Sequence, residues 1–345
     1  GKYNSYHNPL VKDKNMQGYV KFNQLFGSKT FYDLQASYLE SSYKRGDGQF
    51  FIGEEISSLP GKDGYLYPSI LAYGDTNTVP GISSMGGTVS SSANFRVFRN
   101  PGTVSGQVTL KNTQALSFNL NVTHQILTKK LGNHELKFGG EYKQFKVRNY
   151  TANVIGFGSV ANPNKYTNVS PGGVINYPVI TELDANANFM DAYGYDVFGN
   201  EIESDYYVDG LNVTEGPKKP RIGAFYLQDK MEFNYFNTNI GVRVDYMDPN
   251  TLVPIDYRDL KGADGQLNEA DYQKVEKTFE VSPRLGFSFP ITDKTIFHAQ
   301  YGKFIQLPAL ENLYTNQRVL RDLANGGVGY FTIFNNPLLK PEKTT

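Results

Sequence analysis

Hydrophobic and polar residues alternate with a period of two along several stretches of the chain. In the clearest stretch, 116–126, one parity carries Leu116, Phe118, Leu120 and Val122, and the other carries Ser117, Asn119, Asn121 and Thr123. Because successive side chains of a strand point to opposite faces, this pattern predicts a strand with one apolar and one polar face. No long stretch shows the helical spacing i, i+3, i+4, i+7, so amphipathic helices are not expected.

Eight segments of this kind are predicted to be strands: 16–26, 31–44, 106–127, 134–148, 221–234, 238–247, 279–289 and 295–304. Their connections alternate between short and long. The short ones are 27–29, 129–133, 235–237 and 290–294, and the long ones are 45–105, 149–220, 248–278 and everything after 304. In an up-and-down meander, alternate connections emerge at opposite ends of the sheet. The short turns are therefore expected at one end and the long loops at the other.

This asymmetry predicts the fold class. Structureless loops longer than about 12–15 residues are uncommon in compact domains, whereas bacterial outer-membrane barrels combine short periplasmic turns with long extracellular loops. We therefore expect an all-β, antiparallel, up-and-down transmembrane β-barrel. The sequence begins and ends in mid-pattern, and open sheet edges are too costly to leave in lipid. The chain is accordingly interpreted as a piece of a larger barrel.

Composition narrows the possible functions. The 345 residues include 34 Lys and Arg against 34 Asp and Glu, and no Cys. A neutral chain without a basic block does not suit nucleic acid, whose binding depends on clustered cations. The four His lack close metal-ligand spacing, and no GxSxG nucleophile motif or phosphate-binding loop is found. We expect no enzyme activity, no cofactor and no bound metal.

Several segments together resemble one known family. These are 222–233, 239–246, the hairpin formed by 281–293 and 299–304, the segments 306–314 and 336–344 (NPLLKPEKT), and the upstream strand 134–142. They resemble TonB-dependent outer-membrane receptors of the Bacteroidetes type. The resemblance covers about half of the chain directly, and the NPLLKPEKT stretch is its most specific part.

The resemblance implies a fold and a set of partners. The family has a 22-stranded barrel, an N-terminal plug in the lumen, and a short box that contacts TonB, which transmits the proton-motive force. No stretch here resembles the plug, the box or the final aromatic-ended strand. Residues 1–345 are therefore expected to form a partial barrel domain, without a plug domain or a C-terminal closing strand.

The implied function is import of a nutrient, such as a siderophore, oligosaccharide, peptide or cobalamin, across the bacterial outer membrane. The implied partners are outer-membrane lipid, the TonB complex through the plug segment and, in one branch of the family, a SusD-type surface lipoprotein.

Three alternatives stay open. The first is a non-transporting outer-membrane barrel that serves as an adhesin or as a scaffold in an envelope complex. Its strands would look the same, and a plug with a TonB box in the complete gene would distinguish the two. The others are an outer-membrane enzyme, for which the catalytic residues are missing, and a secreted β-sandwich adhesin, which would leave the membrane without detergent.

Charged residues on the strands are the first candidate site. Arg243 and Asp245 share a parity opposite to their apolar neighbours, and Arg284 does the same on its own strand. Because Arg on the lipid face costs roughly 2–4 kcal/mol at mid-bilayer, these side chains are expected to face the lumen and the plug. They either grip the plug and release it when TonB pulls, or form a structural ion pair of about 1 kcal/mol or less.

Aromatic residues in the loop 149–220 are the second candidate site. Tyr193, Tyr195, Tyr206 and Tyr207 lie among several Asp residues there. Stacking combined with hydrogen bonding suits the recognition of a sugar or a peptide. The same residues also suit a loop that packs on itself, and the sequence leaves both interpretations open.

Overall fold

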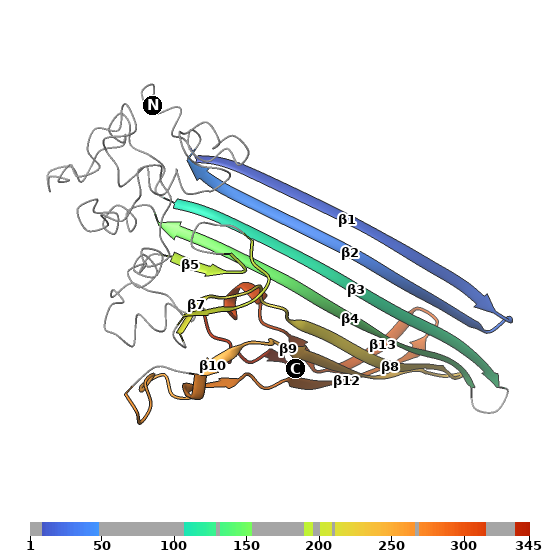
Figure 1. Cartoon of the computed structure of the whole chain (residues 1–345). Helices are drawn as coiled ribbons and strands as arrows, with labels where there is room; N and C mark the ends of the chain where they lie inside the picture. The colour runs from blue at the N-terminus through green and yellow to red at the C-terminus, as the bar shows by residue number, and fades with distance from the viewer. Residues whose placement is uncertain are drawn as a thin grey trace, which may run out of the picture.

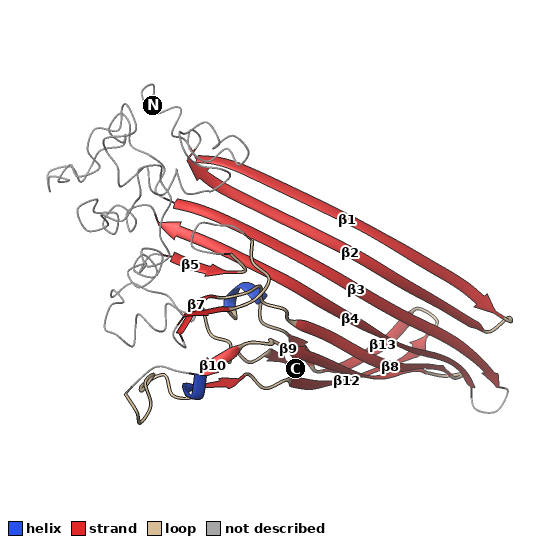
Figure 2. Cartoon of the chain, in the orientation of Figure 1, coloured by secondary structure: helices blue, strands red, loops and turns tan. Residues whose placement is uncertain are grey.

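A computed structural model of the chain describes residues 9–47, 107–128, 132–153, 190–195, 201–208, 211–265, 269–314 and 335–345. Strands account for most of these residues, and the only helices described are two single-turn 3₁₀ helices, η4 (Glu269–Asp271) and η5 (Leu310–Asn312) (Figure 2). Within the described residues, no helix has the length and apolar character needed to cross a membrane.

Eight strands form one continuous antiparallel sheet in the order β1-β2-β3-β4-β8-β9-β12-β13 (Figure 1). Their bounds are β1 Pro9–Phe26, β2 Thr30–Asp47, β3 Gln107–Thr128, β4 Gly132–Asn153, β8 Arg221–Glu232, β9 Asn237–Asp248, β12 Thr278–Thr292 and β13 Thr295–Gly302. All eight predicted strands are confirmed, and most are longer than predicted. The largest difference is in β1, which begins at Pro9 instead of residue 16.

The register places all four short turns at one end of the sheet. Thr30, which begins β2, lies opposite His124 near the end of β3. Asn133 near the start of β4 lies opposite Glu232 at the end of β8. Ser288 near the end of β12 lies opposite Asn237 at the start of β9. The long connections therefore leave from the opposite end, as predicted, and the sheet has the polarity of an outer-membrane barrel.

The two faces of the sheet differ in polarity, because directly opposite residues share a face. On one face Leu120 lies opposite Leu34, and Phe225 lies opposite Val244. The large apolar side chains of this face are exposed, with 45% of Phe118 and 54% of Phe225 accessible. They are not inside a dry protein core, as expected for side chains that face lipid.

The strands near the N-terminus are longer than a membrane crossing requires. β3 and β4 contain 22 residues each, whereas about 9–11 tilted residues cross the hydrocarbon core. The large exposed apolar side chains of β3, Leu116 to Ile126, lie toward its turn end, so the remainder of the strand, 107–115, extends beyond the bilayer on the side of the long loops.

Short strands occur inside the segments that were predicted to be loops. They are β5 Met190–Tyr193, which pairs with β4, and the pairs β6 Tyr206–Val208 with β7 Leu211–Thr214, β10 Leu252–Pro254 with β11 Tyr272–Lys274, and β14 Phe304–Gln306 with β15 Glu342–Thr344. The prediction of loops without strands over 149–220, 248–278 and after 304 is therefore wrong at these positions. Three or four residues are too few to produce a period-two signal.

Two prolines lie inside β12, and the predicted turn 290–294 begins too early because of one of them. Pro290 belongs to the strand, which reaches Thr292 through a register shift. A proline is tolerated beside such an irregularity, although it has no N–H to donate. Pro283 lies where β13 has ended, and its carbonyl accepts the N–H of Lys303 at 3.0 Å. Its absent N–H would point to this same side, away from β9, so no hydrogen bond between β12 and β9 is lost.

The polarity of the faces can be tested on β8. Replacing Phe225 by Arg places a charge on the apolar face, and we expect the free energy of unfolding in lipid to fall by about 2–4 kcal/mol. The measurement is denaturant unfolding of the full-length protein in bilayers. Gln228→Arg, on the polar face of the same strand, is the matched control and should change little. Equal losses in the two variants would contradict the assignment of the faces.

Candidate functional site

A line of polar side chains crosses the polar face from β1 to β8. Lys21 on β1 lies 3.8 Å from Asp33 on β2. Asp33 accepts a hydrogen bond of 3.1 Å from the Asn121 amide on β3, and the Asn121 carbonyl accepts one of 2.7 Å from the Tyr226 hydroxyl on β8. Tyr226 lies directly opposite Arg243 on β9. We call these five residues, together with Glu141 and Asp245, the inner belt.

Tyr226 crosses β4 to reach Asn121, and Gly139 makes this possible. Gly139 lies directly between them in the register, opposite Asn121 on one side and Tyr226 on the other. A Cβ atom at position 139 would lie 2.9 Å from both Cε1 and the hydroxyl of Tyr226, closer than real Cβ contacts. A glycine inside a strand often marks a close approach of another group. The sequence therefore contained a signal for a close contact at Gly139, but it did not show that Tyr226 makes this contact.

Arg243 spans a strand in the same way. Its Nη2 donates to Glu141 on β4 at 2.8 Å and its Nε donates to Asp245 at 2.8 Å. Ala224 on β8 lies opposite both carboxylates in the register, and its small side chain leaves room for the guanidinium. Asp245 is the least exposed of the three, with 10% of its side chain accessible. Arg243 and Asp245 thus lie together on the polar face, and Glu141 is a partner that the sequence did not reveal.

Arg284 lies on the polar face of β12 but makes a different contact. Its guanidinium carbon is 5.0 Å from the ring centroid of Phe304 on β14, within the range of a cation–π interaction. Nearby, Lys343 on β15 forms an ion pair of 2.7 Å with Glu280 on β12. These two contacts hold the paired strands β14 and β15 to the sheet. The structure therefore does not bring Arg284 together with Arg243 and Asp245.

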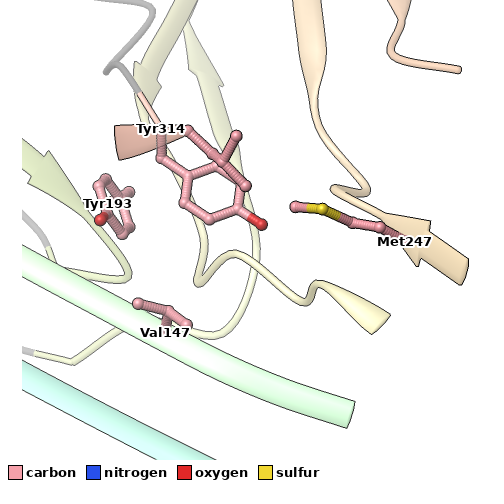
Figure 3. Close-up of a cluster of buried hydrophobic side chains, with 5 residues drawn as sticks. Val147, Tyr193, Met247 and Tyr314 are labelled. Atoms are coloured by element: carbon pink, nitrogen blue, oxygen red, sulfur yellow. The ribbon is translucent and has the colours of Figure 1, made fainter. Parts of the chain in front are cut away.

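At the long-loop end, the polar face carries a small hydrophobic cluster, here called the rim cluster, of Val147, Tyr193, Met247, Leu313 and Tyr314 (Figure 3). Leu313 and Tyr314, which follow η5, are completely buried. The Tyr314 hydroxyl donates to the Pro249 carbonyl at 2.8 Å, and its ring meets the Tyr193 ring at a centroid distance of 5.9 Å and 61°. The cluster ties the segment after β14 to β4, β5 and β9.

The predicted ligand-binding tyrosines fall into two groups. Tyr193 and Tyr195 are each 5% exposed, and burial raises the pKa of both phenols, so both rings are neutral. Tyr195 contacts the edge of Tyr150 on β4 at 6.2 Å. Tyr206 and Tyr207 lie in β6, and their side chains are outside the described part of the chain. Contact of these four residues with a ligand stays a prediction.

A polar contact on the other face connects β4 to residues around Gly194 and Glu203. Lys146 Nζ and Arg148 Nη2 each lie 2.6 Å from the same Glu203 oxygen, and Tyr195 and Glu201 form an isolated β-bridge. Gly194 has a φ of 73° and lies against the Arg148 side chain, where a Cβ would not fit. We call this contact the Arg148 latch. No pattern in the sequence predicts this contact.

None of these groups forms a catalytic arrangement. Among the described residues, no three His, Asp or Glu side chains are grouped so that they could hold a metal ion. What the inner belt offers is a row of fixed hydrogen-bonding and charged groups along one face of the sheet. Such a face suits contact with water, with a polar solute or with a protein segment inside a barrel.

Comparison with known proteins gives one family match. Residues 6–345 match the family described as TonB dependent receptor-like, beta-barrel. No curated protein matches the chain.

Two solved structures are similar in fold. The siderophore receptor PiuA from Acinetobacter baumannii has 12% identity and a TM-score of 0.42, covering 98% of this chain and 37% of its own. The ferric citrate transporter FecA in the unliganded form has 10% identity and a TM-score of 0.39, covering 96% and 31%. The chain thus spans about a third of the length of these two solved chains.

The Arg148 latch should depend on pH. The hydrogen bond from Lys146 lowers the pKa of the Glu203 carboxyl, so the latch is stabilised above the ordinary titration range of Glu and weakens as pH falls through the lowered pKa. The Ile202 amide donates to the Gly194 carbonyl at 3.1 Å, and we expect its protection factor against hydrogen exchange to fall at acid pH. In Glu203→Gln this pH-dependent fall should disappear, and equal pH profiles of the protection factor in the two proteins would refute the role of Glu203.

Proposed function

Because the chain belongs to the TonB-dependent receptor-like β-barrel family, we propose that it forms part of the wall of a receptor that imports a nutrient. Barrels of this family lie in the bacterial outer membrane, and this chain lies there with its short turns toward the periplasm and its long loops toward the exterior. The proposed role is binding and transport, with no catalysis. The family match over nearly the whole chain is the observation that carries the proposal.

The polar face supports a route for solute. The inner belt places hydrogen-bonding groups of β1, β2, β3, β8 and β9 on the side of the sheet away from lipid. In an outer-membrane barrel this side encloses the lumen. We propose that a plug fills the lumen at rest, and that the TonB complex, acting through the plug, opens a path along this wall.

We also propose that residues 1–345 form only part of a 22-stranded barrel, with the plug domain and the closing strand supplied outside them. The sheet order ends at β1 on one side and at β13 on the other. Unpaired backbone groups at these edges would each cost several kcal/mol in lipid, so further strands must pair with them.

Sequence motifs support a proposal for the branch of the receptor family to which the chain belongs. The stretch 336–344 and the hairpins of β8–β9 and β12–β13 support a receptor of the Bacteroidetes type. For a receptor of that type we propose a nutrient too large for passive porins, such as a siderophore, oligosaccharide or peptide. A SusD-type surface lipoprotein is the partner proposed for the branch of the family that uses one.

Deleting the complete gene tests the function. We expect slower growth of the deletion strain on at least one scarce nutrient from a panel of ferric siderophores, ferric citrate, cobalamin, oligosaccharides and peptides. The same defect should appear on deletion of TonB, and the double deletion should be no worse, because both proteins act in one step. Unchanged growth on the whole panel, together with lost adhesion or a lost envelope complex, would favour the adhesin or scaffold instead.

The role of Arg243 can be tested separately. Arg243→Gln leaves Glu141 and Asp245 without their shared cation, and we expect the free energy of unfolding to fall by about 1–2 kcal/mol. If Arg243 only stabilises the wall, uptake per folded molecule will stay normal. If it also holds the plug, as we propose, uptake will fall further than the amount of folded barrel does. Lys137→Gln, which breaks an ion pair of 2.8 Å with Glu135 on the polar face of β4, is the control.

A further inference from the structure

The polar face of β1, β2 and β3 has a stretch without charged side chains, on the long-loop side of the inner belt. It consists of the odd-numbered positions in 15–19, 37–41 and 113–117, here called the neutral track. Its side chains are Asn, Gln and Tyr on β1, Ser, Leu and Ser on β2, and Thr, Ala and Ser on β3. The register places them directly opposite one another on three neighbouring strands (Figure 1).

Charged residues border the neutral track at both ends. At the long-loop end, Asp13, Tyr43 and Lys111 lie directly opposite one another across the three strands. At the other end, Lys21 belongs to the inner belt, where it lies 3.8 Å from Asp33. These residues have the same parity within their strands as the track, so the track lies on the polar face. The charges are confined to the two ends, and the track itself presents no ion to a solute.

The hydrogen-bonding groups of the neutral track are available to a solute. Within the part of the chain that the structure describes, the Asn15 amide donates to Asp13 at 3.2 Å, and no other side chain of the track makes a hydrogen bond. Hydroxyl and amide side chains both donate and accept hydrogen bonds. A solute rich in hydroxyl groups, which also donate and accept, therefore matches this surface.

Two tyrosines provide flat surfaces at different heights of the same face. Tyr19 is in the row nearest the inner belt, and 67% of it is exposed. Tyr43 lies beyond the opposite end of the track. Because Tyr19 lies opposite Ser37, the two rings are separated along β2 by about 20 Å, at about 3.3 Å per residue. A tyrosine ring joins an apolar surface to a hydroxyl, so the pair suits an extended molecule with both apolar faces and hydroxyl groups.

The cations next to the neutral track do not make it a site for anions. On β4, Lys143 lies opposite Ser117 of the track, but it forms an ion pair of 3.2 Å with Glu141. Lys21 has Asp33 as its neighbour. An anionic solute is held best by Arg or Lys donors aimed at its oxygens, and the track contains none. The surface therefore favours an uncharged solute over an anionic one.

We propose that the neutral track binds an uncharged oligosaccharide during import. Its Ser, Thr, Asn and Gln side chains bind sugar hydroxyls, and Tyr19 and Tyr43 pack against the apolar faces of sugar rings. The inference rests on the proposed import function and narrows its substrate to one chemical class. Anionic siderophores and ferric citrate are accordingly expected to be poor ligands of this surface.

Binding by the full-length receptor in detergent tests the proposal. A glycan array presents neutral oligosaccharides beside uronic acid analogues of the same length, and titration calorimetry then measures the affinity of the neutral glycan that binds best. We expect the wild type to bind at least one neutral oligosaccharide. Its uronic acid analogue should bind about tenfold more weakly, because an unpaired carboxylate has to lose water on the track.

Two pairs of variants locate the binding surface. Ser117→Asp places a charge on the track and should weaken binding of the neutral glycan by about tenfold. Ser288→Asp makes the same change on the polar face of β12, near the short turns, and should bind like the wild type. Tyr43→Ala should also weaken binding by about tenfold, because a stacking surface is lost. Tyr38→Ala, on the lipid face of the same strand, is its control.

Tyr43→Phe keeps the ring and should retain binding, which keeps the test valid if the other variants fold poorly. Three results would overturn the proposal. One is an array on which no neutral glycan binds. The second is equal affinity for neutral and uronic acid glycans. The third is normal glycan binding by Ser117→Asp and Tyr43→Ala together with easier release of the plug, which would mean that this face contacts the plug instead.

Failure of the sugar site and failure of the import function give different results. If growth on an anionic nutrient depends on the complete gene and on TonB, while no glycan binds, the import function stands and the sugar site is refuted. If a neutral glycan binds at the track but the deletion strain grows normally on it, the site stands and the import function is refuted.

Discussion

The whole structure depends on one constraint, which is that every long strand separates lipid from water. Backbone N–H and C=O groups in the hydrocarbon must be paired within the sheet, and side chains must be apolar on one face and polar on the other. Phe225 and Tyr226 are neighbours in sequence, yet one is an exposed apolar residue of the lipid face and the other donates a hydrogen bond on the inner face. The inner belt and the polarity of the turns both follow from this alternation.

Much of the fold could be predicted because this constraint is local. A period of two is visible over ten or more residues, so all eight long strands were found, and the alternation of short and long connections gave the polarity of the sheet. The short strands β5, β6, β7, β10, β11, β14 and β15 could not be predicted, because each is only three or four residues long and forms by pairing with another segment of the chain. The sequence places Pro290 in a turn, because a register shift inside a strand leaves no separate sequence signal.

The candidate site was predictable only in part. Parity placed Arg243, Asp245 and Arg284 on the polar face, but partners depend on register, which pairs residues about a hundred positions apart. Arg243 reaches Glu141 across β8, whereas Arg284 lies against Phe304. For the tyrosines of the loop 149–220, burial was the property that the sequence could not predict. An aromatic residue in a long loop has the same sequence signature whether it is buried, as Tyr193 is at 5% exposure, or open to solvent.

The unequal lengths of the strands make the wall lopsided. β4 continues from Gln144, which lies opposite the first residue of β8, up to Asn153. At about 3.3 Å per residue this adds about 30 Å along the strand. The part of the sheet formed by β1 to β4 thus extends farther at the long-loop end than the part formed by β8 to β13. Loops that leave from β1 to β4 begin farther from the membrane than loops that leave from β8 to β13. A large ligand held by both sets of loops would therefore lie tilted relative to the membrane plane.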